Sequence, residues 1–192
     1  MLKFTLDTNC IIAVDDQRAD AQAIRQLADA HRDGRADVAL VAISASERQR
    51  DGAMLDNYTK FEERLRALDL VHLEILLPMD YTDVMFWDAC VCADQNMADF
   101  EAKIQAILFP NVPVSWANYC QNQGLDPDDL VIDKKWKNAK CDVQAFWCHA
   151  HNTRDVFVTS DKNFHSEVKK KSLLALAGGR IELPDAAALL VS

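Results

Sequence analysis

The seven-residue run D-V-A-L-V-A-I, residues 37–43, most constrains what this chain can fold into. Every residue after the first is apolar, which is typical of a parallel strand buried on both faces. Parallel strands are joined by long crossover connections, which are usually helices. The run therefore predicts a sheet that has helices packed on both of its sides.

Other stretches of the chain fit the same plan. Strands are predicted at residues 4–6, 155–159 and 180–183, and residues 71–77 form either another strand or an extended piece. Amphipathic or capped helices are predicted at residues 20–31, 55–70, 138–152 and 167–176, and a last one begins at Pro184. This order predicts an α/β fold in three layers, α/β/α, around a central, mostly parallel sheet.

The 192 residues are most simply one domain, residues 1–192, with a helical insertion at about residues 78–137. Within it, residues 81–109 read as two helices, and residues 115–122 as a short helix that ends before Gly124. The aromatic and methionine side chains of this segment are typical of a hydrophobic core rather than of a cofactor site.

The composition of the chain excludes some classes of function. The formal net charge of −9 excludes a binder that relies on a broad basic surface. An acidic enzyme can still bind a polyanion where divalent cations offset the carboxylates of its site. The six cysteines follow no common disulfide or zinc pattern, and Lys3 and Asp7 interrupt the apolar start of the chain. These features predict a cytoplasmic protein with reduced thiols and without a membrane partner.

Acidic residues stand where predicted strands end. Asp7 follows the first strand, Glu47 the second and Asp161 the strand at 155–159, while Asp142 lies in the first turn of a helix that Asn138 caps. The carboxyl ends of parallel strands meet at one edge of a sheet, so these four carboxylates are expected to converge. Such a group becomes stable when Mg²⁺ or Mn²⁺ lies between its members, because hard cations take oxygen ligands.

Each of three acids also has a simpler explanation. Asp7 would cap the next helix, since Asp is a favoured N-cap residue. Glu47 would complete a capping box with Ser44, because the S-x-x-E spacing is met. Asp142 would only favour the start of its helix through the helix dipole. The residues alone leave both explanations open.

The ordered set of motifs resembles the PIN domain, a family of metal-dependent nucleases that includes the toxins of VapBC toxin–antitoxin pairs. The motifs are D-T-N after the first strand, a Glu after the second, the Asp of K-C-D-V-Q-A-F-W-C-H-A, and T-S-D-K-N-F after a late strand. They cover residues 2–51 and 138 to about 187. The resemblance implies that the catalytic and metal-binding residues are Asp7, Glu47, Asp142 and Asp161. It implies polar support from Thr8, Asn9, Ser160 and Asn163.

The resemblance also implies a reaction. One or two Mg²⁺ or Mn²⁺ ions would promote hydrolysis of RNA phosphodiester bonds and leave 5′-phosphate and 3′-hydroxyl ends. Glu47 would be a ligand or a base that orients the attacking water. The implied partners are RNA and, for a toxin, an antitoxin protein and a second copy of the chain as a homodimer. The span between Glu47 and Asp142 is longer than in compact members of the family.

Basic residues near the predicted ligands are candidates for binding phosphate, namely Arg48, Lys140 and Lys162. The cluster of lysines at residues 134–140 is favoured, because it approaches Asp142 in sequence. Solvated surface charge is the simpler explanation for most of these residues.

Two other function classes fit the pattern less well. A non-catalytic RNA-binding or assembly module with this fold has no need of four carboxylates. A small-substrate phosphohydrolase of the haloacid-dehalogenase type carries D-x-D-x-T, whereas Asn9 stands where its second Asp is required.

Overall fold

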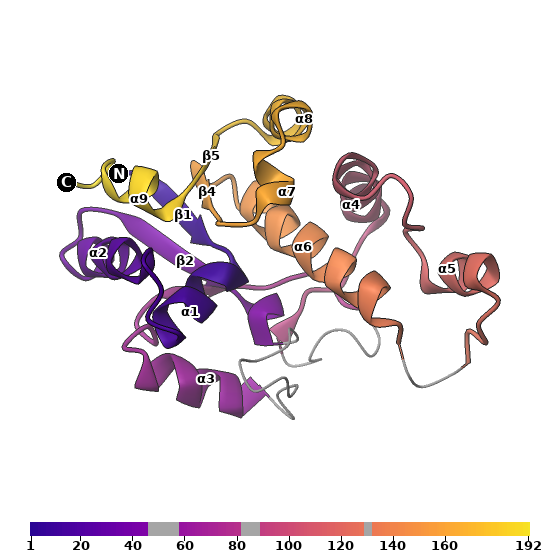
Figure 1. Ribbon diagram of the computed structural model, residues 1–192, viewed down its shortest axis with the longest axis horizontal. Helices are drawn as coiled ribbons and strands as arrows, with labels where there is room; N and C mark the ends of the chain where they lie inside the picture. The colour runs from indigo at the N-terminus through magenta and orange to yellow at the C-terminus, as the bar shows by residue number, and fades with distance from the viewer. Residues whose placement is uncertain (46–57, 82–88, 129–131) are drawn as a thin grey trace.

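The computed structural model describes the chain except for residues 46–57, 82–88 and 129–131 (Figure 1). Its centre is a five-stranded, all-parallel sheet in the order β3-β2-β1-β4-β5. The strands are β1 (Lys3–Leu6), β2 (Asp37–Val41), β3 (Glu74–Leu76), β4 (Val156–Val158) and β5 (Arg180–Glu182). The predicted α/β fold with a central parallel sheet is confirmed.

Helices cover both faces of the sheet, because the strand side chains alternate between two apolar clusters. Phe4 and Leu6 pack on one face, and Ala39 and Val41 pack on the other. The first face is covered by α1 (Thr8–Asp15), α2 (Ala21–Arg32), α3 (Tyr58–Ala67) and α9 (Pro184–Ala188). The second is covered by α4 (Gln95–Leu108), α6 (Lys134–His151), α7 (Lys162–His165) and α8 (Glu167–Ala177). Figure 1 shows α5 (Trp116–Gln123) farther from the sheet than α4 and α6.

Helix α6 begins at Lys134, four residues before the predicted cap at Asn138. Its N-cap is Asp133, whose side chain accepts hydrogen bonds from the backbone N–H groups of Lys135 and Trp136. Asp142 therefore lies in the third turn, so its predicted place in the first turn is wrong. The explanation that rested on the helix dipole fails with it, because that effect falls off within the first turn.

Three other element boundaries differ from expectation. The strand predicted at 37–43 ends at Val41, and Ala42–Ala45 forms a 3₁₀ turn. Within the segment predicted as two helices, Gln95–Leu108 forms α4, residues 90–94 are not helical, and Val91 pairs with Met79, while residues 82–88 lie outside the described residues. Helix α7, which was not predicted, begins where the Asp161 side chain accepts a hydrogen bond from the Asn163 N–H. The short helix predicted at 115–122 is confirmed as α5, with Gly124 in the left-handed conformation behind it.

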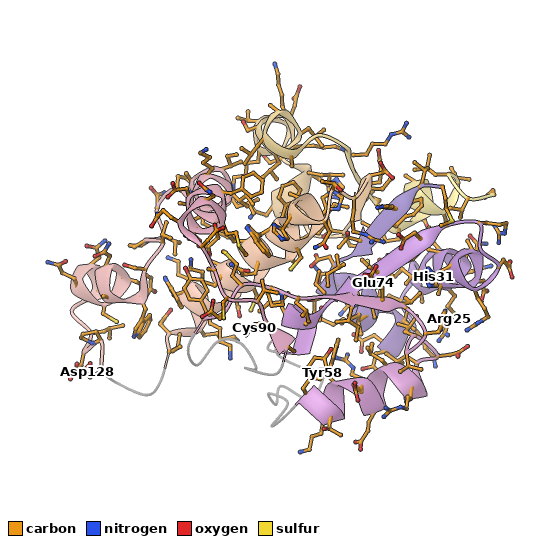
Figure 2. The ribbon with its side chains drawn as sticks, turned by 180° about the vertical axis from the view of Figure 1, so that it is seen from behind. Arg25, His31, Tyr58, Glu74, Cys90 and Asp128 are labelled. Carbon is orange, nitrogen blue, oxygen red and sulfur yellow. The ribbon has the colours of Figure 1, made fainter. Side chains whose placement is uncertain are left out.

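The amino-terminal edge of the sheet is held by one arginine. The guanidinium of Arg154, just before β4, donates to the backbone carbonyls of Phe4 and Asp37. It also pairs with the Asp37 carboxylate at 2.7 Å and with that of Glu74 (Figure 2) at 3.3 Å. Arg154 thus ties β1, β2 and β3 together at the edge opposite to Asp7. In the described part of the chain, no helix has the length and apolar character needed to cross a membrane.

Candidate metal site

The sheet has a topological switch point between β1 and β4. From β1 the chain builds outward through β2 and β3, and it then returns to place β4 and β5 on the other side of β1. Ligands of open α/β sheets bind in the crevice outside the carboxyl ends of strands at such a point. Asp7 follows β1 directly, and Ser160 and Asp161 follow β4. The backbone N–H of Asp7 donates to the carbonyl of Val158, which joins the two strand ends.

Asp7 is buried at this crevice, with 1% of its surface exposed. It is the N-cap of α1, and its Oδ1 accepts a hydrogen bond from the Thr8 N–H at 2.8 Å. Its Oδ2 accepts from the Thr159 hydroxyl at 2.7 Å and from the Asn9 side-chain amide at 3.2 Å. The capping explanation for Asp7 is therefore confirmed. It accounts for one carboxylate oxygen, while the other is held by side chains from the ends of both strands.

The surroundings of Asp7 disfavour its charge. Burial raises the pKa of the Asp7 carboxyl above its ordinary value, and the nearby Asp161 carboxylate raises it further. The hydrogen bonds from Thr159, Thr8 and Asn9 oppose this rise in pKa. All three of these donors are neutral, and among the described residues no cation is a source of the shift. A buried carboxylate beside a second one is the kind of donor set that fits a hard divalent cation.

Thr159 links the two carboxylates and was missed in the sequence. Its hydroxyl donates to Asp7 and accepts a hydrogen bond from the backbone N–H of Asp161 at 3.0 Å. Thr159 is fully buried at the end of β4. Its place at the end of a predicted strand is visible in the sequence, but that place does not show whether its hydroxyl faces Asp7.

A further acid, Asp20, lies near the same strand ends. Its side chain makes no capping hydrogen bond to α2 and instead accepts from the Ser160 hydroxyl at 2.7 Å. The carboxylates of Asp7 and Asp20 both add to the effect of burial in raising the pKa of the Cys10 thiol. Asp20 was interpreted only as a helix cap, and no sequence pattern indicated this contact.

The polar residues expected to support the site are partly placed there. Thr8 is buried, and its hydroxyl forms a 2.8 Å hydrogen bond with that of Ser44, which joins the ends of β1 and β2. Asn9 contacts Asp7, and the backbone N–H of Asn163 donates to Asp161. Two predicted residues, Glu47 and Arg48, lie outside the described residues.

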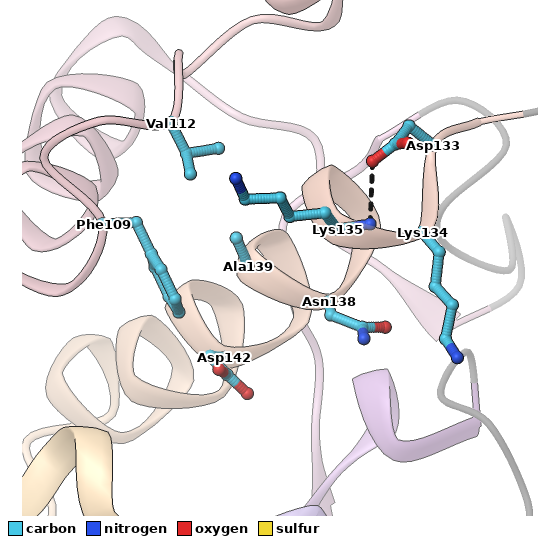
Figure 3. A pocket seen from close by; sticks show the side chains of 8 residues that line it. All are labelled: Phe109, Val112, Asp133, Lys134, Lys135, Asn138, Ala139 and Asp142. Atoms are coloured by element: carbon cyan, nitrogen blue, oxygen red, sulfur yellow. Dashed lines mark hydrogen bonds between the residues drawn. The ribbon is translucent and has the colours of Figure 1, made fainter.

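Asp142 lies half-buried on α6 at one end of a cleft of about 570 Å³ (Figure 3). In the part of the chain that the structure describes, no three or more His, Cys, Asp or Glu side chains gather into a group that could hold a metal ion. Glu47 is outside that part. Of the four predicted ligands, the structure thus brings Asp7 and Asp161 together and places Asp142 in a cleft beside α6.

The predicted phosphate-binding lysines separate in the structure. Lys140 is fully buried, and its Nζ pairs with the carboxylate of Glu101 at 2.6 Å. The expectation that Lys140 contacts substrate is therefore wrong, because its ammonium group is buried in the core, where it pairs with Glu101. Lys162 is exposed at the start of α7, next to Asp161. Lys134 and Lys135 are exposed and line the same cleft as Asp142.

Comparison with known proteins adds no assignment: no protein-family model matches the chain, and no protein of curated function matches it significantly.

Proposed function

We propose that this protein is a metal-dependent endoribonuclease with a PIN-like fold that hydrolyses phosphodiester bonds of RNA. One observation carries the proposal: carboxylates from the ends of β1 and β4, Asp7 and Asp161, lie together at the switch point of the sheet. The Asp7 carboxylate is buried there among neutral donors, which favours either a proton or a bound cation. A bound divalent cation would favour the ionised carboxylate.

The residues that would hold Mg²⁺ or Mn²⁺ are Asp7 and Asp161, with Asp142 and Glu47 completing the proposed set. The bound ion supplies the positive charge that holds the scissile phosphate and lowers the pKa of an attacking water. The protein supplies orientation. Thr159 fixes Oδ2 of Asp7, and Asn9 donates to the same oxygen, so this carboxylate keeps one geometry.

The finer parts of the proposal concern the biological setting. The nuclease proposal includes a cytoplasmic location and an RNA substrate, whether or not the protein is a toxin. The toxin of a toxin–antitoxin pair would in addition bind an antitoxin protein and would form a homodimer. Expression of a toxin arrests growth, and the product of a neighbouring gene restores it, whereas a housekeeping nuclease shows neither effect.

The nuclease is tested by incubating the wild-type protein with a mixed pool of structured and single-stranded RNAs, in Mg²⁺, in Mn²⁺ and in chelator. The Asp7→Asn variant is compared with Asp185→Asn, which changes an exposed acid in α9. We expect metal-dependent cleavage by wild type and by Asp185→Asn, and a loss of about 100-fold or more in Asp7→Asn. Full activity of Asp7→Asn would refute the assignment. A folded wild type that binds RNA without metal-dependent cleavage would identify a non-catalytic RNA-binding module instead.

A further inference from the structure

The cleft that holds Asp142 lies between α6, which carries one of the PIN-like motifs, and residues 109–112, which lie outside the part of the chain that the resemblance covers. One wall is the surface of α6 that carries Lys134, Lys135, Asn138 and Asp142. The opposite wall is Phe109, at the end of α4, followed by Val112. Figure 3 shows the Phe109 ring facing α6 near Ala139 and Asp142. We name this space the Phe109 cleft.

A lysine of α8 ties the Phe109 cleft to the candidate metal site. The Nζ of Lys169 donates to the carbonyl of Leu108, the residue before Phe109, at 2.8 Å. The same Nζ donates to the side-chain oxygen of Asn163, whose backbone N–H donates to Asp161. One ammonium group therefore fixes the end of α4 against α7. The same Nζ lies 6.0 Å from the centre of the Phe109 ring.

The charges of the cleft suit a bound polyanion once the candidate metal site is filled. Lys134 and Lys135 are exposed, and Figure 3 shows their side chains spreading to different sides of the α6 end. The nearby Asp133 carboxylate accepts hydrogen bonds from the Tyr119 hydroxyl and the first N–H groups of α6, which lower its pKa, so it stays negative and its charge is opposed by that of Lys135. The remaining acid, Asp142, belongs to the proposed metal ligands, so a divalent cation would offset its charge.

We propose that the Phe109 cleft is a base-binding subsite, in which one unpaired base of the RNA stacks on Phe109 and adjacent phosphates bind Lys134 and Lys135. This inference rests on the proposed nuclease function and adds its substrate form. Aromatic rings bind bases by stacking, which is available only where the base is not already stacked within a duplex. A half-buried ring on the wall of a cleft is within reach of a splayed-out base, whereas a paired base is shielded by its neighbours.

The test measures binding of a short fluorescein-labelled single-stranded RNA by anisotropy in Ca²⁺, a hard cation that can fill the carboxylate site, under conditions where the RNA stays intact, with the same RNA as a duplex in parallel. We expect Phe109→Leu, which keeps an apolar side chain, to weaken single-strand binding about 5-fold or more. Phe109→Tyr, which keeps the ring, should bind as wild type does. Replacing Lys134 and Lys135 by Gln should lower the slope of log Kd against log salt concentration by roughly 0.7 for each lysine.

The matched control is Phe100→Leu, a half-buried phenylalanine of α4 outside the cleft, and thermal unfolding verifies that each variant folds. Unchanged single-strand binding by Phe109→Leu, or equal binding of duplex and single strand, would refute the subsite even if wild type cleaves RNA. Ring-dependent binding by a wild type that cleaves nothing would support the subsite and count against the nuclease. In Mg²⁺, Phe109→Leu should raise KM with little change in kcat, because the stack forms before the chemical step.

Discussion

At the scale of single residues, Asp7 combines a structural and a chemical role that oppose each other. Burial and Asp161 raise the pKa of its carboxyl above the ordinary value of 3.8. The folded state then holds the Asp7 proton more tightly than the unfolded state does. The stabilisation is complete below pH 3.8 and is lost as the pH rises through the folded-state pKa. Without metal, ionising Asp7 as the pH rises through the folded-state pKa therefore costs stability.

Asp7→Asn keeps the shape of this side chain and removes its ionisation. The amide NH2 also replaces one of two oxygens that accept hydrogen bonds, which costs stability equally at every pH. In chelator we expect the stability of the variant relative to wild type to rise by about 1.4 kcal/mol for each pH unit between 3.8 and the folded-state pKa, and to be independent of pH below 3.8. Added Mn²⁺ should stabilise wild type but not the variant. Thermal unfolding across pH measures both effects, with Asp185→Asn as control. A stability difference between variant and wild type that does not change with pH would contradict this account.

The sequence indicates those residues of the site whose side chains carry recognisable chemistry. Asp7 and Asp161 each follow a predicted strand, where an acid is either a helix cap or a ligand, and in the structure both also cap a helix. Thr159 and Asp20 were not indicated in this way, because their roles depend on which strand ends are neighbours. A threonine or a capping aspartate looks the same in the sequence, whether it faces another carboxylate or solvent.

At the scale of elements, one side of α6 lines the Phe109 cleft and another side packs in the core against α4. Asp142 lines the Phe109 cleft, whereas Lys140, two residues before it, is directed into the core against α4. There Glu101 accepts hydrogen bonds from Lys140, from the Tyr81 hydroxyl at 3.0 Å and from the Gln144 amide at 3.1 Å. Gln144 in turn accepts from the backbone N–H of Met79. This polar network fixes how α4 packs on α6.

Removing one partner of this ion pair should be more harmful than neutralising both. Lys140→Met leaves the Glu101 carboxylate buried without its cation, so we expect a loss of about 3–5 kcal/mol in the free energy of unfolding. The double variant Lys140→Met with Glu101→Gln should recover most of that loss. Urea unfolding of the two single variants and the double variant gives the coupling energy. Losses that simply add would show that the two charges are independent. Lys103→Met, an exposed lysine of α4, is the control and should change stability little.

The start of α6 shows why the sequence misled at this scale. Asp133 and Asn138 are both favoured caps, and local propensity does not choose between them. The choice is made by tertiary packing, because Trp136 is buried beside Tyr81 and Trp116 only if the helix already includes it. The Lys140–Glu101 pair was likewise hidden, since its partners lie 39 residues apart.

At the scale of the whole molecule, the sequence predicts the parallel sheet but not the order of its strands. Apolar runs separated by amphipathic helices leave few alternatives to a parallel sheet with two covered faces. Strand order follows from which crossovers fold to which side, and no single run encodes that. The switch point between β1 and β4, which brings Asp7 to Asp161, therefore appeared only in the structure.

The two ends of the strands have different roles. Arg154 stabilises the sheet at the amino-terminal ends, and the candidate site lies at the carboxyl-terminal ends. Arg154 joins three strands at their amino-terminal ends through two backbone carbonyls and two carboxylates. Arg154→Met leaves these acceptors without their donor, so we expect a loss of about 1–3 kcal/mol in the free energy of unfolding. Arg154→Lys should recover only part of it, because an ammonium group cannot reproduce the planar fork of donors.

The molecules that remain folded should keep the wild-type response to Mn²⁺ and the wild-type cleavage rate, because the strands separate Arg154 from Asp7. Urea unfolding and cleavage per folded molecule measure the two properties on the same preparation. Arg25→Met, which changes an exposed arginine of α2 (Figure 2), is the control for loss of a positive charge. Asp7→Asn is the opposite case, in which cleavage is lost although Arg154 still joins the three strands. A fall in cleavage per folded molecule in Arg154→Met would show that the two ends are coupled through the strands.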